Sequence, residues 1–370
     1  MRPRLKQVGW TRDLHTLRVV MDHRDHLEID DADGTVERLL ELLRAGGRTI
    51  ADLSAELSRP GHSVPPDDVV AAVGALDAAR LLQDGDRLGT LAPSRHERYF
   101  SNLAFFEPFA SLDTATEELQ SRLLDCHVLV LGAGGLGGNV VQNLAGLGVG
   151  RMTLMDRDVV QARNFARQFL YQWEDIGRPK VELAAQWVRA FDPAIAVQAI
   201  SGEIDSADAL SRLLEDARPD LVVSGIDQPR GVDLWVNAAC VTSGVPFVRG
   251  GMFVTEGLVL SVDPGKSGCL DCTTPENTGG DPLAGRDLDN ARIYAEEVRI
   301  NRGIGPVATL LSSLVAFEAL RYLTRFEPPA YAGNLLWIDF AAGCATRREP
   351  WARNPNCSAC AADSASMQRR

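Results

Sequence analysis

The segment from Cys126 to Asp156 constrains the fold more than any other part of the chain. It begins with the apolar run His127–Leu131, which is short enough for a buried strand. The glycine-rich sequence GAGGLG occupies 132–137, apolar positions then recur at helical spacing as far as Leu147, and a second short apolar run ends at Asp156. A strand, a glycine turn, a helix and a strand in this order predict one nucleotide-binding unit of a doubly wound α/β sheet.

The glycines of this unit indicate how phosphate would be held. Gly132, Gly134, Gly135 and Gly137 permit a tight turn and a close approach of the backbone, so the N-terminus of the following helix can face phosphate oxygens. Asp156 lies about 20 residues beyond the glycines, where a carboxylate can accept a ribose hydroxyl. A glycine motif alone is a weak signal, but the complete unit predicts a nucleotide site without identifying the nucleotide.

Length and charge argue against several classes of protein. With 370 residues the chain is long enough for two or three domains, each with its own core. A formal net charge of −12 argues against a general nucleic-acid or anionic-membrane surface. No apolar run reaches the length of a membrane span and the N-terminus lacks a signal-peptide core, so the sequence predicts a cytoplasmic protein.

The first 90 residues predict a small winged-helix domain. Apolar patterns indicate two strands followed by three short helices: strands at 17–21 and 27–29, and helices at 36–43, 50–57 and 66–81. The third helix carries one basic residue, Arg80, so DNA recognition in the major groove is not expected. Segment 83–95, rich in glycine, proline and charge, is interpreted as the linker to the next domain.

This order of elements resembles the PqqD-like precursor-peptide recognition element of peptide-modifying enzymes. The resemblance rests on the pattern of strands and helices and on no specific motif. It implies that residues 1–90 bind an extended leader peptide by adding it as a strand to a sheet edge. The alternative is a small packing or dimerisation domain.

Polar side chains gather after the second strand of the nucleotide-binding unit. Asn164, Arg167 and Gln168 lie close together in sequence there, and the planar guanidinium of Arg167 suits phosphate oxygens. Lys180 begins a helix that runs to about Phe191. A cation in a first helical turn opposes the helix dipole, so an anionic partner would explain Lys180. The alternative is an ordinary solvated lysine.

An acidic residue follows a further predicted strand. Residues 221–223 are apolar, and Asp227 comes shortly after them. The carboxyl ends of parallel strands are where such sheets bind ligands, and an aspartate there is a natural Mg²⁺ ligand for nucleotide phosphates. The alternative is that Asp227 caps the following helix.

Two CxxC motifs predict a structural zinc site. Cys269 and Cys272 form the first motif, and Cys357 and Cys360 form the second. Four thiolates complete a tetrahedral zinc site and leave no open position for catalysis. The metal would fasten the C-terminal segment to the rest of the domain. The alternative, a redox dithiol, needs a single CxxC near a thioredoxin-like pattern.

Other features are given structural interpretations. Cys126, Cys240 and Cys344 are interpreted as core or neutral surface residues, because free cysteine is usually buried and unreactive. The polar, glycine-rich segment Pro275–Asn290 predicts a functional or mobile loop. The apolar helix Val307–Leu323 predicts core packing and a subunit interface.

Taken together, these motifs resemble the ThiF/MoeB adenylating superfamily, which shares its fold with ubiquitin-activating enzymes. The motifs are GAGGLG, DRDVV, NFARQ, GRPK, SGID and the paired CxxC ending in NPNCSAC, and the resemblance covers about residues 95–361. Within the superfamily, WVNAACVTSGVPFVRGG and VDPGKSGCLDC look most like the microcin C peptide-adenylating enzymes of the MccB type. Those enzymes also carry a small N-terminal peptide-binding domain.

The resemblance implies a fold and a set of site residues. Residues 91–361 would form a Rossmann-like, mostly parallel sheet, and 362–370 a disordered tail. It implies a homodimer and MgATP, with Asp227 holding Mg²⁺, beside the structural Zn²⁺ that the CxxC motifs predict. The nucleotide would be bound by Gly132, Gly134, Gly135, Gly137, Asp156, Asn164, Arg167, Gln168 and Lys180.

One motif departs from the superfamily pattern. The usual Arg-Tyr-x-Arg sequence before the first strand reads Arg98-Tyr99-Phe100-Ser101 here, so Ser101 replaces the arginine that would reach the partner's active site. Transition-state charge is then neutralised either less strongly or by another basic residue such as Arg98.

The resemblance also implies an activity. The chain would activate the C-terminal carboxylate of a ribosomally synthesised precursor peptide with ATP in antibiotic-like natural-product biosynthesis. Arg167 and Lys180 would stabilise charge on the α-phosphate while Asp227 holds the metal. The alternatives are adenylation of a ubiquitin-like sulfur-carrier protein and a non-catalytic leader-peptide carrier. A nicotinamide oxidoreductase is disfavoured because these charged residues have no role in hydride transfer.

Overall fold

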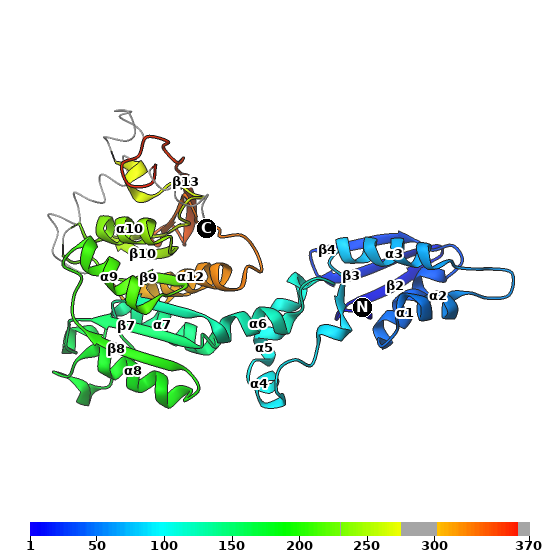
Figure 1. Ribbon diagram of the computed structural model, residues 1–370, viewed down its shortest axis with the longest axis horizontal. Coiled ribbons are helices and arrows are strands. Elements are labelled where there is room, and N and C mark those ends of the chain that lie inside the picture. Colours follow the sequence, from blue (N-terminus) through cyan, green and yellow to red (C-terminus); the bar gives the residue numbers. More distant parts are fainter. Residues whose placement is uncertain (230, 275–301, 362–370) are drawn as a thin grey trace. The chain divides into compact units, whose positions relative to one another are not determined.

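The computed structural model describes residues 1–229, 231–274 and 302–361. The chain forms two compact units, Met1–Arg122 (unit 1) and Leu123–Arg370 (unit 2), shown in Figure 1. Residues 91–122 belong to unit 1, whereas the sequence placed them in the second domain. The predicted loop at 275–290 and the predicted tail at 362–370 lie outside the described residues.

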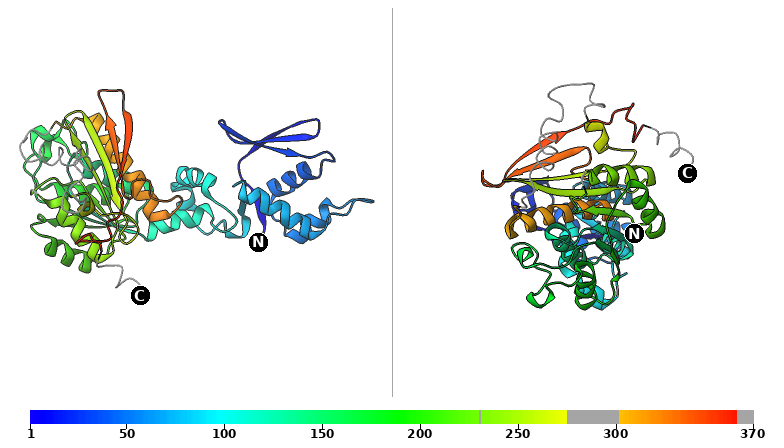
Figure 2. Two further views of the ribbon diagram at one scale, coloured as in Figure 1. Left: turned by 90° about the horizontal axis from the view of Figure 1, so that it is seen from above. Right: turned by 90° about the vertical axis from the view of Figure 1, so that its left-hand side faces the viewer.

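Unit 1 packs a small antiparallel sheet on a layer of helices, as the left view of Figure 2 shows. The sheet has the order β2-β3-β4, and a separate antiparallel pair joins β1 to β5. The strands are β1 Pro3–Leu5, β2 Gly9–Asp13, β3 Thr16–Asp22, β4 Asp25–Asp30 and β5 Leu82–Asp84. The helices are α1 Thr35–Ala45, α2 Ile50–Leu57, α3 Pro66–Ala78, α4 Pro93–Arg98 and α5 Phe100–Phe106, followed by α6 Thr116–Asp125, which begins in unit 1 and ends in unit 2.

Local signals explain several elements of unit 1. α2 begins at a capping box, in which the Thr49 hydroxyl accepts the Asp52 N–H (3.3 Å) and the Asp52 carboxylate accepts the Thr49 N–H (2.9 Å). The predicted strands at 17–21 and 27–29 lie within β3 and β4, and the three predicted helices match α1, α2 and α3 to within a few residues. Strands β1, β2 and β5 were not predicted.

The interpretation of residues 83–95 as a linker is wrong. Leu82–Asp84 forms β5, whose three side chains are buried and which pairs with β1. The carboxylate of buried Glu117 accepts the backbone N–H groups of residues 89–91 at distances of 2.5 to 2.9 Å. Glycine and proline do indicate turns here, but partners within unit 1 satisfy their backbone groups, so the segment is part of the fold.

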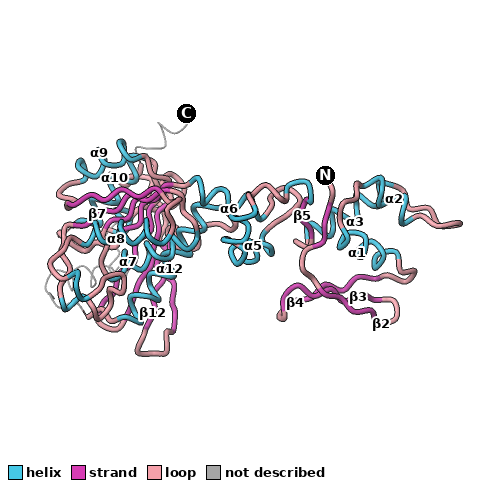
Figure 3. The backbone as a smooth tube through the Cα atoms, turned by 90° about the horizontal axis from the view of Figure 1, so that it is seen from below, coloured by secondary structure: helices cyan, strands magenta, loops and turns pink. Residues whose placement is uncertain are grey.

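Unit 2 is built on an eight-stranded sheet with the order β13-β12-β11-β10-β9-β6-β7-β8. The five strands from β10 to β8 are parallel, and β11, β12 and β13 extend the sheet in antiparallel fashion. Helices α9 and α10 cover one face, and α7, α8 and α12 cover the other (Figure 3). This is the mostly parallel α/β sheet that the sequence predicted.

The elements of unit 2 follow in chain order. The strands are β6 His127–Leu131, β7 Arg151–Asp156, β8 Ala196–Ser201, β9 Leu221–Ser224, β10 Phe247–Phe253, β11 Glu256–Val262, β12 Asn334–Asp339 and β13 Ala345–Pro350. The helices are α7 Gly135–Leu147, α8 Lys180–Phe191, α9 Ala207–Ala217, α10 Val232–Ser243 and α12 Gly305–Thr324, and short 3-10 helices include η3 Ala162–Asn164 and η5 Leu270–Thr273. The chain passes from β6 to β7 and β8 on one side, whereas β9 lies on the other side of β6. Strand order therefore reverses between β6 and β9, which is where open α/β sheets bind ligands.

α12 is a core helix of unit 2. Among the described residues it alone is long and apolar enough to cross a membrane, judged by length and composition, and 67% of its apolar window is buried. Its fully buried Glu318 accepts the Ser261 hydroxyl (2.7 Å) and the backbone N–H groups of Ala330 (2.9 Å) and Tyr331 (2.8 Å). A buried carboxylate with three donors fixes the helix against β11 and the segment before β12.

Candidate active site

A large cavity lies at the carboxyl ends of the parallel strands of unit 2. Its volume is about 1390 Å³, which exceeds the roughly 300–1,000 Å³ of ordinary small-molecule pockets. Four neighbouring strands contribute to its lining: Leu131 ends β6, Asp156 ends β7, Asp227 follows β9 and Arg249 lies on β10. All the predicted nucleotide-site residues except Gly137 line this cavity.

The glycine turn brings β6, β7 and α7 into close contact. Gly132 has a φ of +93°, which side-chain-bearing residues rarely adopt, and its N–H donates to the Met155 carbonyl (2.7 Å). A Cβ on Gly137 would lie 1.7 Å from the Gly132 carbonyl oxygen, so only glycine permits this approach of α7. Gly137 therefore shapes the turn from behind, and Gly132, Gly134 and Gly135 face the cavity.

The Asp156 carboxylate fastens the turn to β7. One oxygen accepts the N–H of Ala133 (2.6 Å), and the other accepts the N–H of Asp158 (2.7 Å). Each carboxylate oxygen has a further lone pair, and Asp156 lines the cavity. The side chain can therefore hold the turn and accept a ligand hydroxyl together.

Arg167 and Gln168 lie against the glycine turn. A Cβ on Gly135 would meet Arg167 Cγ at 3.0 Å, and one on Gly134 would meet Gln168 Nε2 at 3.5 Å. The backbone N–H groups of Arg167 and Gln168 both donate to the Asn164 carbonyl, at 3.0 and 2.9 Å. These two hydrogen bonds keep Asn164, Arg167 and Gln168 together beside the glycine turn.

One buried acceptor in the lining has no partner among the described residues. The Gln168 side chain is 4% exposed, and its Oε1 accepts no hydrogen bond. An unpaired buried acceptor costs free energy, so a ligand hydroxyl or amine at this position would explain it. This acceptor, the glycine turn and the Asp156 carboxylate together fit a nucleotide.

Lys180 is buried at the first turn of α8, with 4% of its surface exposed. Its ammonium donates to the Asp158 carboxylate (2.9 Å), and its backbone N–H donates to the Asp158 carbonyl (3.0 Å). The alternative of a solvated lysine is therefore wrong. Asp158 supplies the anionic partner that the position requires, and Lys180 still lines the cavity.

Asp227 is exposed beyond the end of β9 and faces the same cavity. Burial lowers the pKa of the Arg167 guanidinium, and the neighbouring Asp227 charge opposes that shift. The capping alternative for Asp227 is wrong, because α10 begins at Val232 with Gly231 as its N-cap residue.

An ion pair in the lining was not predicted. Arg249 Nε donates to Asp233 Oδ1 (2.6 Å) and Nη2 donates to Oδ2 (3.2 Å), while Nη1 donates to the Gly250 carbonyl. Arg249 pairs in parallel register with Ser224, so it lies beside the strand end that precedes Asp227. The signal that would have indicated it is an arginine inside the otherwise apolar strand sequence VPFVRGG.

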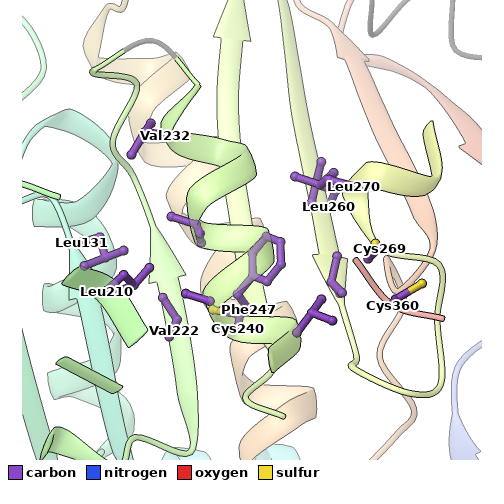
Figure 4. Close-up of a cluster of buried hydrophobic side chains, with 14 of the residues drawn as sticks. Leu131, Leu210, Val222, Val232, Cys240, Phe247, Leu260, Cys269, Leu270 and Cys360 are labelled. Carbon is purple, nitrogen blue, oxygen red and sulfur yellow. The ribbon is translucent and has the colours of Figure 1, made fainter. Parts of the chain in front are cut away.

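The lining divides into two halves. The polar half consists of the glycine turn and the charged residues after β6, β7 and β9. The apolar half is formed by side chains of β10, β11, η5 and α12, chiefly Met252, Phe253, Leu258, Leu260, Leu270 and Leu311. Leu260 and Leu270 also belong to the buried cluster drawn in Figure 4, which includes Phe247 and Val222.

Four buried cysteines come together at η5, which contains Cys272 and has Cys269 as its N-cap residue. The Sγ atoms of Cys269, Cys272, Cys357 and Cys360 all lie within 4.8 Å of one another, with neighbouring pairs at 3.5, 3.7 and 3.9 Å. Four Zn–S bonds of about 2.3 Å at tetrahedral angles place sulfurs roughly 3.8 Å apart. The spacing therefore fits one metal ion held by four thiolates, as the sequence predicted, and not a disulfide of about 2 Å.

The cysteine cluster adjoins the cavity wall. Asn237 of α10 is fully buried, accepts the Leu270 N–H (2.9 Å) and donates to the Asp271 carboxylate (2.7 Å). Leu270 and Thr273, on either side of Cys272, line the cavity. A metal on the four cysteines would thus hold part of the apolar half in place.

The three remaining cysteines lie outside the lining. Cys240 is fully buried, and Cys344 is exposed in the turn between β12 and β13. Burial, together with the nearby Asp220 and Asp125 charges, raises the pKa of the Cys126 thiol to about 12. A thiol with a raised pKa is a weak nucleophile, which agrees with the structural interpretation of Cys126.

The departure from the Arg-Tyr-x-Arg pattern lies in unit 1. Arg98 ends α4 and places its guanidinium over the Tyr99 ring at 4.9 Å, and Ser101 lies on α5.

Comparison with known proteins identifies the family. Residues 108–359 match the ThiF family. The SAMP-activating enzyme E1 of Haloferax volcanii is 32% identical over 249 residues, covering 67% of this chain and 85% of that protein. The sulfur carrier protein adenylyltransferase of Thermus thermophilus is 35% identical over 249 residues, covering 66% and 85%.

Solved structures extend the similarity of fold to nearly the whole chain. The crystal structure of E. coli MccB with ATP has a TM-score of 0.75 at 20% identity and covers 97% of this chain and 100% of that one. MccB in complex with N-formylated MccA gives a TM-score of 0.73 at 20% identity, covering 97% and 100%. The chain belongs to the ThiF family and is an ATP-dependent adenylyltransferase.

Proposed function

We propose that this enzyme uses MgATP to adenylate the C-terminal carboxylate of a ribosomally synthesised precursor peptide. The observation that carries the proposal is one cavity of about 1390 Å³ in which a polar half, containing the glycine turn, adjoins an apolar half. The polar half suits ATP, and the remaining space suits the end of a peptide. A carboxylate oxygen attacks the α-phosphorus, the α–β phosphoanhydride bond breaks, and pyrophosphate leaves as the peptidyl adenylate forms.

The residues of the polar half have distinct roles in this proposal. Gly132, Gly134 and Gly135 admit the phosphates close to the backbone at the start of α7. Arg167 and Lys180 stabilise the charge that develops on the α-phosphate, because Lys180 is buried and Arg167 is half-buried in the cavity lining, where water screens their charges less. Asp227 would hold Mg²⁺, which neutralises phosphate charge when it is bound. Asn164 and Gln168 complete the wall, with Gln168 Oε1 ready to accept a nucleotide hydroxyl.

Unit 1 supports a peptide substrate. The curated sulfur-carrier relatives align over about two thirds of the chain, whereas the fold similarity to MccB covers 97% and so includes unit 1. MccB is known in complex with N-formylated MccA. β4 is an edge strand of the three-stranded sheet and carries Leu27, whose side chain is 38% exposed. An exposed apolar residue on an edge strand suits the addition of a peptide strand.

A second candidate is adenylation of a sulfur-carrier protein. It is favoured by the names of the Haloferax volcanii and Thermus thermophilus relatives, which are 32% and 35% identical. In this case unit 1 would be a packing or dimerisation domain. A homodimer and a cytoplasmic location stay predictions under both candidates.

ATP–pyrophosphate exchange separates the candidates. The purified enzyme is assayed with synthetic peptides encoded by short reading frames beside its gene, and separately with a sulfur-carrier protein ending in Gly-Gly. Exchange with a peptide supports the proposal, exchange with the carrier alone supports the second candidate, and exchange with neither would contradict both.

The role of unit 1 is tested with a matched pair of variants. Leu27→Asp introduces a charge at the β4 edge, and Leu14→Asp introduces the same charge at a side chain that is 85% exposed between β2 and β3. We expect Leu27→Asp to raise the peptide KM about tenfold or more and leave ATP affinity unchanged, because the contact is remote from the reacting carboxylate. An unchanged KM for Leu27→Asp would contradict leader binding at this edge.

A further inference from the structure

The Arg249–Asp233 pair lies at the border between the two halves of the cavity. Across the sheet, the strand ends run from Asp156 on β7, through the glycine turn after β6 and Asp227 after β9, to Arg249 on β10. A nucleotide that has its ribose at β7 and its phosphates at β6 leaves β10 to the second substrate. Among the charged residues at the ends of β7, β6, β9 and β10, Arg249 is thus the one next to the apolar half.

Arg249 has hydrogen-bonding capacity that the fold does not use. A guanidinium has five N–H groups, and three of those on Arg249 go to Asp233 and the Gly250 carbonyl. For the other two, no acceptor is recorded among the described residues. Its side chain is only 13% exposed, whereas that of Asp233 is 43% exposed. If the Arg249–Asp233 ion pair only connected β10 to α10, the two remaining N–H donors of Arg249 in the cavity wall would have no function.

The apolar half defines what surrounds these donors. Leu258, Leu260 and Leu270 are each less than 7% exposed, and they border the cavity as an extension of the buried cluster of unit 2. Met252 and Phe253 continue this surface along β10 beyond Arg249. A polar or charged side chain placed here would lose its hydration without gaining a partner.

We propose that Arg249, held by Asp233, is a specificity-determining residue that grips the terminal carboxylate of a peptide whose last side chains are apolar. The inference rests on the proposed adenylation of a peptide C-terminus. One carboxylate oxygen accepts the free N–H groups of Arg249, and the other is left to attack the α-phosphorus. Because Asp233 neutralises the guanidinium, the hydrogen bonds from Arg249 orient the carboxylate without strongly reducing the charge on its attacking oxygen.

The substrate class is tested with a peptide panel in ATP–pyrophosphate exchange. The probes are one octapeptide with its last two residues changed to Leu-Leu, Val-Phe, Asn-Asn, Asp-Asp or Lys-Lys, together with the Leu-Leu peptide as a C-terminal amide. We expect the two apolar peptides to exceed the polar ones in kcat/KM by about 10- to 100-fold, from the burial of one or two apolar side chains. The amide should give no exchange.

The residue is tested with Arg249→Met, Arg249→Lys and the double variant Arg249→Met/Asp233→Leu. Arg249→Met should lower kcat/KM for the apolar peptides by about 10- to 100-fold, which is the effect of losing hydrogen bonds between charged groups. ATP affinity should stay within about twofold, and Arg249→Lys should recover only part of the activity because it lacks the planar fork. Arg212→Met, at an exposed position on α9, is the matched control.

The outcomes separate this inference from the proposed function. Exchange that is equally efficient with all the free-acid peptides, or full activity of the double variant, would overturn the inference and leave peptide adenylation standing. Full activity of the double variant would mean that the Arg249–Asp233 ion pair has only a structural role, because replacing both charges together would then leave catalysis unaffected. Exchange with none of these peptides, and with none of the peptides encoded beside the gene, would overturn the proposed function itself, and the inference with it.

Discussion

Loss of one ligand from the four-cysteine cluster should destabilise unit 2 strongly. The perturbation is Cys357→Ser, which replaces a buried thiolate in a cluster whose sulfur spacing fits a tetrahedral metal. The metal would join residues that are 88 positions apart, such as Cys269 and Cys357. Closing a loop of that length removes about 4–5 kcal/mol of chain entropy from the unfolded state. Metal binding is then folding free energy, so the variant should lose a similar amount.

Thermal and chemical unfolding measure this loss. For a unit of this size 1 kcal/mol corresponds to about 2–4 °C, so the midpoint should fall by about 10 °C or more. Elemental analysis should find one zinc per chain in the wild type and much less in the variant. Cys344→Ser is the control, because Cys344 is exposed in the turn between β12 and β13 and joins no metal-type cluster among the residues that the structure describes. A folded wild type without metal, or equal midpoints for Cys357→Ser and Cys344→Ser, would refute the reasoning.

Three further predictions concern the turn, the metal ligand and a buried lysine. Gly137→Ala should lower the free energy of unfolding in urea by about 3 kcal/mol or more, because the new Cβ would lie 1.7 Å from the Gly132 carbonyl oxygen. Gly146→Ala is the control: a Cβ there has nothing within 4 Å, so this change should stabilise α7 by about 0.5–1 kcal/mol. Asp227→Asn should keep the far-UV spectrum and lower Mg²⁺-dependent exchange on the order of 100-fold; near-normal exchange would remove Asp227 from the metal site. Burial lowers the pKa of Lys6 from 10.5 to about 8. Between about pH 8 and 10.5 the unfolded state therefore binds more protons than the folded state. The free energy of unfolding should rise with pH over this range. Lys6→Met should lose that rise in urea titrations at several pH values, and an equal slope in both proteins would contradict the assignment.

Local sequence signals predicted the framework of the site well. The glycine turn, the strand that ends at Asp156 and the CxxC pairs each depend on residues adjacent in sequence, where glycine conformations, apolar runs and ligand spacing act over a few positions. The same holds for α2, whose Thr49–Asp52 capping box is a four-residue pattern. These features need no knowledge of distant contacts, so the fold class of unit 2 could be predicted from them.

Partners that are distant in sequence were beyond such signals. Segment 83–95 reads as a linker because glycine and proline mark turns, but only the folded unit supplies Glu117, about 27 residues away, to bind its N–H groups. Lys180 has the composition of a surface residue, and its burial depends on Asp158, 22 positions earlier. A charged side chain normally stays in water because burial costs free energy, but an oppositely charged partner can compensate that cost.

The sequence alone therefore determined the presence of a nucleotide-binding turn, a mostly parallel sheet and a four-cysteine cluster. Only the tertiary structure decided which side chains share the cavity and how its polar and apolar halves meet. Arg249 illustrates the difference, because its pairing with Asp233 and its place beside the end of β9 follow from strand order. Strand order is set by the packing of helices on both faces of the sheet, and that packing sums many weak contacts between residues far apart in sequence.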